Sequence, residues 1–317
     1  MPTTMTSTMK AVRIHSFGGP DVLRYEDVSV PEPKSNELLI RVHAAGVNPV
    51  DWKIREGHLG QIPLPSVLGS DFAGAVEATG SDVKGFRTGD SVFGIVSDDS
   101  GGYAEYAVAP DSQVARIPKG LDFLHAAALP VASITPWQAL FDIAQLQKGQ
   151  KVLIHAAAGG VGSFAVQFAK WKGAYVIGTA SAQTTDYVKS LGADEVIDYR
   201  KTKFEDVVRD VDVVLDTQGG DTQERSWRVI KPGGILVSIV SPPPKEKPTA
   251  PGVRGVFLSS KPRGDEFAQI ADLVARGIVK VNIETVFPLK DARKAQELSQ
   301  SGHAHGKIVL TTEAESH

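Results

Sequence analysis

The chain has 317 residues, and at roughly 150 residues per domain this length favours two domains that can each bury a core. Its 34 Lys and Arg residues nearly balance its 37 Asp and Glu residues, which argues against electrostatic capture of nucleic acid or of an anionic membrane. Because cysteine is absent, a disulfide scaffold, an iron–sulfur cluster, a thiol nucleophile and any zinc site that needs a thiolate are excluded.

The first eight residues are rich in Thr and carry neither a basic segment nor an apolar segment of the kind found in secretion signals. No apolar run along the chain reaches the roughly 18 residues that a membrane-spanning helix needs. We therefore expect a soluble, cytoplasmic protein whose residues 1–8 form a disordered leader.

Residues 9–132 consist of short apolar runs, beginning with Met9–Ile14, that are separated by turn-forming sequences such as Phe17-Gly18-Gly19-Pro20. Short strands joined by turns rich in Gly and Pro are typical of all-β domains. This part of the sequence therefore predicts a β-barrel or a β-sandwich.

From Ser133 to Leu146 apolar residues recur at helical spacing, which predicts a helix that begins a second domain. Short continuous apolar runs then alternate with helical stretches, as parallel strands covered on both faces require. An α/β fold with an open, doubly wound parallel sheet accounts for this order of elements. The expected strands are Val152–Ile154, Ala174–Thr179, Val196–Ile197, Val213–Leu215, Ile235–Val237 and Val256–Leu258.

The pattern changes again near the end of the chain. Apolar residues from Phe267 to Val274 have helical spacing, whereas Val286 and Ile308–Val309 have the composition of strands. We expect these last strands to return to the first domain.

The strongest local motif is a strand, a glycine turn and a helix. Lys151–His155 has the composition of a strand, and Ala157-Ala158-Gly159-Gly160-Val161-Gly162 follows directly. In such a turn Gly159 lets the backbone approach a pyrophosphate, Gly162 lets helix and strand pack closely, and N–H groups of the first helical turn meet the negative charge. Ala157 replaces the first glycine of the usual pattern, so a tight turn without a ligand is the alternative.

The end of the second strand indicates which dinucleotide binds. Where the cofactor has a free ribose 2′-hydroxyl, an Asp or Glu at this position accepts a hydrogen bond from it. This chain has Ala180-Ser181 there. Ser181 can donate to a 2′-phosphate, and Arg200 or Lys201 can supply positive charge after the third strand. Tyr199 can pack or hydrogen-bond nearby, or it is an ordinary half-buried aromatic. We therefore predict NADPH in preference to NADH.

Seven motifs in order make nearly the whole chain resemble the quinone oxidoreductase (zeta-crystallin-like) branch of the medium-chain dehydrogenase/reductase superfamily. These motifs are Ala45–Asp51, Leu68–Gly74, Gly89–Gly94, Gly102–Tyr106, Ala158–Gly162, Leu191–Asp194 and His305–Leu310. The resemblance implies a GroES-like β-barrel substrate domain, residues 9–132 and 261–317, with a Rossmann NADPH-binding domain, residues 133–260, inserted between its two parts.

The resemblance also bears on zinc. In zinc alcohol dehydrogenases of this superfamily a Cys follows the Gly-Val pair and a Gly-His-Glu sequence follows the next strand. Here Asn48 stands at the first place and Ser70-Asp71 at the second. His303 and His305 have only one residue between them and lack a third ligand close in sequence, so we expect no metal site.

By resemblance, several residues lie near the nicotinamide. Asn48 can anchor a ribose or carboxamide group, and the alternative is an Asn that only makes the turn before Pro49. Thr135 matches a position near the nicotinamide. The residues whose backbone groups would hold the carboxamide are Val240, Ser241, Phe257 and Leu258.

Two residues after Asn48 have open roles. Asp51 either takes part in proton transfer or holds its loop by hydrogen bonds. Trp52 either offers a flat apolar wall to a ring-shaped acceptor or is an indole packed at the surface. We predict Asn48 and Asp51 as the candidate catalytic residues and Trp52 as the candidate residue of the substrate pocket.

Without zinc, hydride from the nicotinamide must go to an acceptor that is already electrophilic. The resemblance therefore implies a reductase of quinones, with enone or alkenal double bonds as the alternative acceptors. A protein that binds NADPH without catalysis is the other class, because a fold does not decide a function. The edge of the Val256–Leu258 strand and the family both favour a homodimer.

Overall fold

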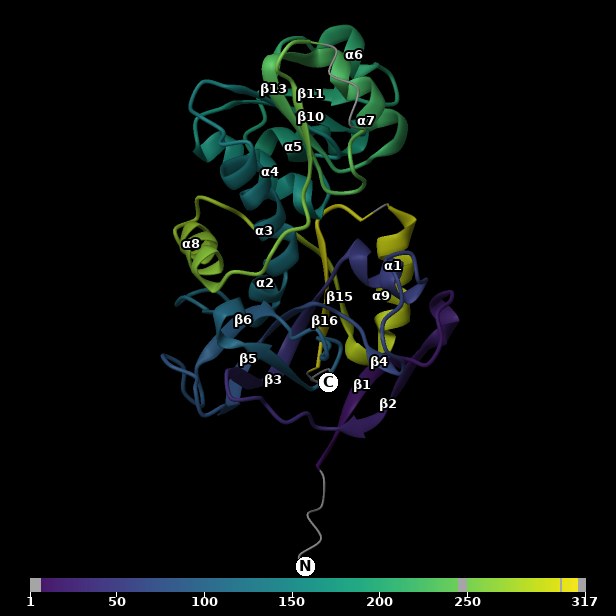
Figure 1. Ribbon diagram of the computed structural model, residues 1–317, viewed down its shortest axis with the longest axis vertical. Coiled ribbons are helices and arrows are strands. Elements are labelled where there is room, and N and C mark those ends of the chain that lie inside the picture. The colour runs from purple at the N-terminus through teal and green to yellow at the C-terminus, as the bar shows by residue number, and fades with distance from the viewer. Residues whose placement is uncertain (1–6, 245–249, 303, 313–317) are drawn as a thin grey trace, which may run out of the picture. The chain divides into compact units, whose positions relative to one another are not determined.

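The computed structural model describes residues 7–244, 250–302 and 304–312, and the chain divides into two compact units (Figure 1). Unit 1 comprises Met1–Val131, Pro262–Arg276 and Val281–His317, and unit 2 comprises Ala132–Lys261 and Gly277–Lys280. No helix within the described residues is long and apolar enough to cross a membrane.

The unit boundaries differ from the expected ranges 9–132, 133–260 and 261–317 in a few residues. Ala132 and Lys261 fall in unit 2, and so does Gly277–Lys280. The last segment is held there because Gln167 donates from Nε2 to the Lys280 carbonyl at 3.0 Å and accepts from its N–H at 2.7 Å.

Part of the range expected to form a leader, residues 1–8, lies in the first strand. Residues 1–6 lie outside the described residues, and Thr8 already belongs to the first strand, where it pairs with Ser29. The leader prediction is therefore wrong at Thr8, because a polar residue at a strand end costs little when its backbone is paired.

Unit 1 is built on β-sheets, as its short apolar runs predict. A three-stranded sheet has the order β2-β1-β4, and a seven-stranded sheet has the order β15-β16-β3-β5-β6-β8 with β7 also paired to β3. The strands are β1 (Thr8–Ile14), β2 (Leu23–Ser29), β3 (Glu37–Val47), β4 (Ser66–Val67), β5 (Asp71–Thr79), β6 (Ser91–Ile95), β7 (Tyr106–Pro110), β8 (Val114–Arg116), β15 (Ile283–Pro288) and β16 (Lys307–Thr311).

The end of the chain returns to unit 1, as expected. Strand β16 pairs antiparallel with β3, so that Ile308 lies opposite Val47 and Thr311 opposite Ala44 (Figure 1). This pairing places Lys307 beside the end of β3. The helices of this unit are α1 (Pro49–Arg55), α2 (Phe123–Ala127), α8 (Gly264–Ala275), α9 (Ala292–Ser301), η1 (Pro20–Val22), η2 (Asp111–Gln113) and η6 (Leu289–Asp291).

Unit 2 contains a six-stranded, wholly parallel sheet with the order β11-β10-β9-β12-β13-β14. In chain order this is 3-2-1-4-5-6, the order of the dinucleotide-binding fold. All six predicted strands are confirmed, and β12 is buried along its whole length. The strands are β9 (Lys151–Ile154), β10 (Tyr175–Ala180), β11 (Glu195–Asp198), β12 (Val211–Asp216), β13 (Ile230–Ser238) and β14 (Arg254–Phe257).

The helix predicted over Ser133–Leu146 differs in both position and type. It begins earlier, at Pro130, and from Gln138 to Ile143 it widens into a π-helix. Pro136 has no N–H to donate, which interrupts the α-helical hydrogen-bond pattern just before the change. The helices of unit 2 are α3 (Pro130–Trp137, beginning in unit 1), η3 (Gln138–Ile143), α4 (Gly160–Trp171), η4 (Ala182–Thr184), α5 (Thr185–Ser190), α6 (Phe204–Val207), α7 (Gly220–Ser226) and η5 (Trp227–Val229).

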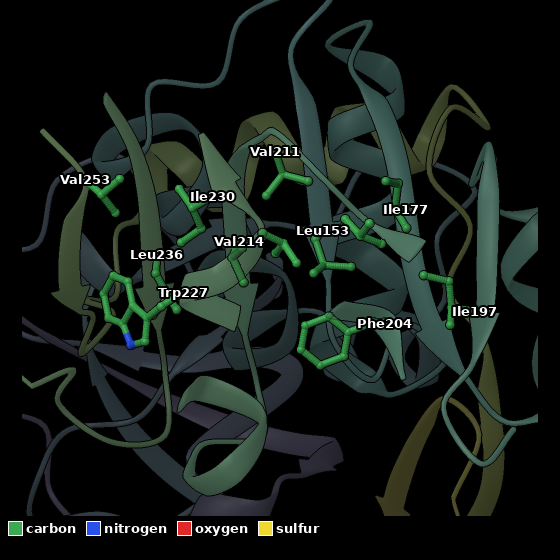
Figure 2. Packing of buried hydrophobic residues seen from close by; sticks show 12 residues of the cluster. Leu153, Ile177, Ile197, Phe204, Val211, Val214, Trp227, Ile230, Leu236 and Val253 are labelled. Carbon is green, nitrogen blue, oxygen red and sulfur yellow. The ribbon is translucent and has the colours of Figure 1, made fainter. Parts of the chain in front are cut away.

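The parallel sheet of unit 2 is covered by aliphatic and aromatic side chains. On one face, Leu153, Val214 and Leu236 come from successive strands and pack with Phe204 and Trp227 (Figure 2). Burying a side chain of this size contributes about 1.5–3 kcal/mol. This packing holds rigid the carboxyl ends of the strands, where the cofactor motif lies.

Candidate active site

The glycine turn joins β9 to α4 in unit 2, as the sequence predicts. Helix α4 begins at Gly160, and no side chain caps its N-terminus at Gly159. The first N–H groups of an α-helix have no acceptor inside the helix, and the helix dipole adds positive potential there. This end of α4 can therefore accept an anionic group such as a pyrophosphate.

The close approach of the helix to the turn depends on Gly162. A Cβ built on Gly162 would overlap the carbonyl oxygen of Ala156 and lie 2.8 Å from Cα of Ala157. Ala157, which stands where the pattern has its first glycine, is held by a hydrogen bond from its N–H to the Thr179 carbonyl at 2.9 Å. The residues of the turn fit a dinucleotide despite the imperfect motif.

Sequence reasoning missed Gly178 in the neighbouring strand β10. A Cβ there would lie 2.8 Å from the side chain of Ala157 and 3.1 Å from that of Val188. The turn therefore needs a glycine that is far from it in sequence. A glycine in the middle of an apolar strand was the available signal, because such a residue often marks a close approach.

Another buried group in this region is His155, at the end of β9. Its Nε2 lies 2.8 Å from the Ser226 hydroxyl and its Nδ1 lies 3.3 Å from the Thr179 hydroxyl. Burial lowers the pKa of His155 to about 4, so the ring is neutral at physiological pH. This histidine supports the start of the turn.

The end of β10 carries no carboxylate, as predicted, and Ser181 is buried there with its hydroxyl 3.1 Å from that of Thr184. Tyr199 and Arg200 follow β11 and are exposed, with the guanidinium 5.7 Å from the centre of the tyrosine ring. Sequence reasoning missed Asp198, which pairs in register with Ala180.

The carboxylate of Asp198 is paired with groups that follow it directly in the chain. Its carboxylate accepts from the Arg200 N–H at 3.1 Å and lies 3.8 Å from the Lys201 ammonium. This region therefore presents two exposed basic side chains and one paired carboxylate. A 2′-phosphate bound there would lie near the two basic side chains and also near the carboxylate of Asp198.

The carboxyl ends of β12 and β13 are organised by Asp216, which sequence reasoning also missed. Its buried carboxylate accepts from the Gly219 N–H at 2.8 Å, from Nε2 of Gln223 at 2.9 Å and from the Ser238 hydroxyl at 2.8 Å. Gln223 also donates to the Ser241 carbonyl at 3.1 Å. A carboxylate directly after the apolar run Val213–Leu215 was the available signal.

The predicted carboxamide residues lie around this group. Val240 is exposed, and the Leu258 N–H donates to the Ser238 carbonyl at 2.9 Å. Phe257 is the last residue of β14 and is 44% exposed. Thr135 on α3 is buried, with its hydroxyl 3.1 Å from that of Ser260. All of these residues belong to unit 2.

In unit 1 the structure brings Asn48 and Asp51 together at the start of α1. The Asn48 N–H donates to Oδ2 of Asp51 at 2.8 Å, and the Tyr103 hydroxyl donates to the same oxygen at 2.8 Å. Nδ2 of Asn48 donates to Oδ2 of Asp71 at 2.8 Å, and its Oδ1 accepts from the ammonium of Lys307. All five side chains are buried.

This cluster holds two carboxyl groups and one ammonium away from water. Burial raises the pKa of Asp51 to about 7 and that of Asp71 to about 6, while it lowers the pKa of Lys307. Oδ1 of Asp51 has no hydrogen-bond partner among the described residues. Sequence reasoning found Asn48 and Asp51 but gave no site role to Asp71, Tyr103 or Lys307, which are distant in the chain.

Trp52 lies next to this cluster in sequence and is partly buried. Its Nε1 is buried and has no partner within the described part of the chain, and the Lys53 ammonium lies 5.6 Å from the ring centre. The indole therefore has one face next to a cation. Its role in an acceptor pocket stays a prediction.

Two family models match the chain. The family described as "Alcohol dehydrogenase GroES-like domain" covers residues 34–119, and the family described as "Zinc-binding dehydrogenase" covers residues 191–310. The quinone oxidoreductase of Sus scrofa is 38% identical, over 95% of this chain and 97% of that protein.

Solved structures agree with these matches. The quinone oxidoreductase from Coxiella burnetii is 37% identical with a TM-score of 0.89 and covers 97% of this chain and 100% of its own. An NAD-dependent alcohol dehydrogenase is 31% identical with a TM-score of 0.88 and covers 96% of this chain and 100% of its own. The chain belongs to the quinone oxidoreductase branch of the medium-chain dehydrogenase/reductase superfamily. It is therefore an oxidoreductase that uses a nicotinamide cofactor.

The residues present do not fit the zinc that one family description names. The chain has no cysteine, and no group of three His, Asp or Glu side chains able to hold a metal occurs in residues 7–244, 250–302 and 304–312. At the two positions compared above, Asn48 and Asp71 already bond to each other, and both face the ammonium of Lys307. His303 lies outside the described residues.

Proposed function

We propose that this protein is an NADPH-dependent reductase that transfers hydride to quinones without zinc. The observation that carries the proposal is the glycine turn between β9 and α4, where Gly162 brings the uncapped end of the helix against the turn. The names of the similar proteins in Sus scrofa and Coxiella burnetii support quinones as the acceptors.

For the cofactor, we propose that the pyrophosphate binds over Ala158, Gly159, Gly160, Val161 and Gly162. Ser181 and Arg200 would contact the 2′-phosphate, with Tyr199 packing beside them. The support is the absence of a carboxylate at the end of β10 together with the exposed guanidinium of Arg200. A hydroxyl and a guanidinium both donate to phosphate oxygens, whereas a carboxylate would repel them.

At the other end of the cofactor, we propose by resemblance that Asn48 and Thr135 lie near the nicotinamide. Backbone groups of Val240, Ser241, Phe257 and Leu258 would hold its carboxamide. When bound, the reduced nicotinamide supplies the hydride. The protein orients the two reactants and donates hydrogen bonds to the oxygen on which charge develops.

Asp51 has a structural role in this proposal. Its Oδ2 accepts from the Asn48 N–H and from the Tyr103 hydroxyl, so it holds the start of α1. Its side chain is fully buried, which supports this holding role over proton exchange with solvent. Trp52 is proposed as an apolar wall for the acceptor ring.

The proposal also includes a homodimer and a cytoplasmic location. A homodimer would cover β14, which lies at one edge of the six-stranded sheet. Cell fractionation tests the location, and a measurement of mass in solution tests the dimer.

Turnover against a panel of acceptors tests the function. Purified protein is mixed with NADPH and with a quinone, an enone or an alkenal, and simple alcohols are tested with NADP. We expect NADPH to be oxidised when a quinone is present. With simple alcohols we expect no reduction of NADP. A higher kcat/KM with enones or alkenals than with quinones would favour double-bond reduction.

Binding without turnover is the outcome that would overturn the reductase. If NADPH binds in a fluorescence titration and no acceptor is reduced, the protein is an NADPH-binding protein without catalysis. The two readouts separate the cofactor site from the reaction.

A further inference from the structure

Lys307 on β16 carries a buried positive charge that the proposed function does not use. Its side chain is 4% exposed, and Nζ donates to the Val47 carbonyl at 2.9 Å and to Oδ1 of Asn48. Oδ2 of Asp71 lies 3.9 Å from the same nitrogen. A lysine is almost never fully buried unless its charge is paired, so this ammonium and the Asp71 carboxylate belong together.

These two charges determine how the Asn48 amide lies. An ammonium can only donate hydrogen bonds and an ionised carboxylate can only accept them. Oδ1 of Asn48 must therefore face Lys307, and Nδ2 must face Asp71, as the structure has them. The reversed amide would place a donor against the ammonium and an acceptor against the carboxylate.

In this orientation one N–H of the Asn48 amide is not used by Asp71. Nδ2 carries two hydrogens, and Asp71 takes one of them at 2.8 Å. Within the described residues no other acceptor contacts Nδ2 of Asn48. The second N–H can therefore donate to an oxygen of a bound molecule.

The surroundings of Asp71 are tightly built. Its Oδ1 accepts from the Val131 N–H at 3.0 Å, in the first turn of α3. A Cβ on Gly46 would lie 2.7 Å from Oδ2 of Asp71, so the carboxylate sits directly over the backbone of β3. Asp71 therefore has little freedom to move away from Asn48.

We propose that Lys307 and Asp71 are positioning residues that hold the Asn48 amide in one orientation and keep its second N–H as a donor for an oxygen of the cofactor or acceptor. This inference rests on the proposed role of Asn48 near the nicotinamide. Misplacing a reacting group by about 1 Å can cost on the order of a hundredfold in rate. Lys307 and Asp71 thus act on turnover through Asn48.

A double-mutant cycle between Lys307 and Asn48 tests the proposal. Lys307→Met should lower kcat about 10- to 100-fold and change the Kd of NADPH less than about threefold, because the phosphate contacts are untouched. In an Asn48→Ala background the same substitution should change kcat less than about twofold, since the amide it positions is gone. A purely structural lysine would lower kcat by the same factor in both backgrounds, and that result would overturn the proposal.

Two further variants guard against a folding defect. Asp71→Asn leaves Lys307 in place. It should lower kcat in the wild-type background and have little effect on kcat in the Asn48→Ala background, as Lys307→Met does. The double variant, Lys307→Met with Asp71→Asn, removes both charges together. Ile308→Val, which removes one methylene from the neighbouring residue of β16, is the control and should keep the wild-type kcat. If all the charge variants fail to fold while Ile308→Val folds, the cluster serves stability and the positioning role is wrong.

The same data separate this inference from the proposed function. If the wild type reduces no acceptor, the reductase proposal fails. If the wild type is active and Asn48→Ala keeps its kcat, Asn48 has no role for Lys307 and Asp71 to support, and the positioning inference fails alone.

Discussion

At the scale of single residues, Ser181 is the position where one side chain can decide between two cofactors. It stands at the end of β10, where a carboxylate would contact a free ribose 2′-hydroxyl. We expect NADPH to bind at least tenfold more tightly than NADH, on the order of 1.4 kcal/mol. Fluorescence titration of the two dinucleotides measures this ratio.

The variant Ser181→Asp should lower the affinity for NADPH by about tenfold or more, because a buried carboxylate repels the 2′-phosphate. Asp198→Asn is the matched control, since it changes the paired carboxylate in the adjacent strand. Equal affinities of the wild type for NADPH and NADH would contradict the assignment.

The buried carboxyl of Asp51 predicts how stability depends on pH. Burial raises its pKa from 3.8 to about 7 in the folded protein, so between these values the folded state holds a proton that the unfolded state has released. Unfolding then releases a proton, and the free energy of unfolding must fall as the pH rises through this range. The stabilising contribution is complete below the unfolded pKa and is lost above the folded one.

Asp51→Asn should remove that part of the pH dependence. Asp71 titrates near pH 6 in both proteins, so the difference between them is clearest from about pH 6 to pH 7. We expect the wild type to lose at least about 1 kcal/mol relative to the variant between acid and neutral pH. Urea unfolding across this range measures it, and parallel curves would show that Asp51 is ionised throughout.

At the scale of elements, the junction of β9 and α4 depends on the space at Gly162. In Gly162→Ala the added methyl meets the backbone of Ala156 and Ala157, which cannot move aside as a flexible side chain can. We expect at least a tenfold loss of NADPH affinity, about 1.4 kcal/mol, and a lower Tm. Titration and thermal unfolding measure the two effects.

Gly19→Ala is the control for that substitution. Gly19 has φ of −68°, and no heavy atom lies within 4 Å of a Cβ built there. The control should keep the wild-type affinity and Tm. If Gly162→Ala also bound NADPH as the wild type does, the turn would not be the pyrophosphate site.

Strand β14 is the element that should carry the dimer. The Leu258 N–H points toward β13, and N–H groups alternate along a strand, so the Phe257 N–H points to the open edge. Phe257→Pro removes that outer donor and should convert a dimer into monomers of 33.8 kDa. Phe257→Ala keeps the N–H and should remain dimeric, and light scattering at micromolar concentrations distinguishes the two.

At the scale of the whole molecule, the ion pairs and hydrogen bonds of unit 1 predict how the protein responds to metal removal. Asn48 and Asp71 are already bonded to each other, and both face the ammonium of Lys307, which would repel a divalent cation. Purified protein should therefore carry less than about 0.1 zinc per chain, and a chelator should leave kcat unchanged. Elemental analysis decides this, and one zinc per chain lost together with activity would contradict it.

Local sequence determined much of the architecture. The inner strands of unit 2 are recognisable because a strand buried on both faces must be apolar along most of its length, and Val213–Leu215 has this composition. The glycine turn is recognisable for a similar reason, since Gly162 is required by a contact only a few residues away, with Ala156. Both features depend on residues that are close together in the chain, so they can be predicted from one sequence.

Only the tertiary structure decided which residues from separate parts of the chain meet. Lys307 reaches the Val47 carbonyl across 260 positions of the chain, Gly178 makes room for Ala157, and Gln167 holds Lys280 in unit 2. A buried ion pair or a close approach between separate segments leaves no periodic pattern, so the sequence does not show which two residues meet. The energy of such a contact exists only once the sheets have brought the two segments together.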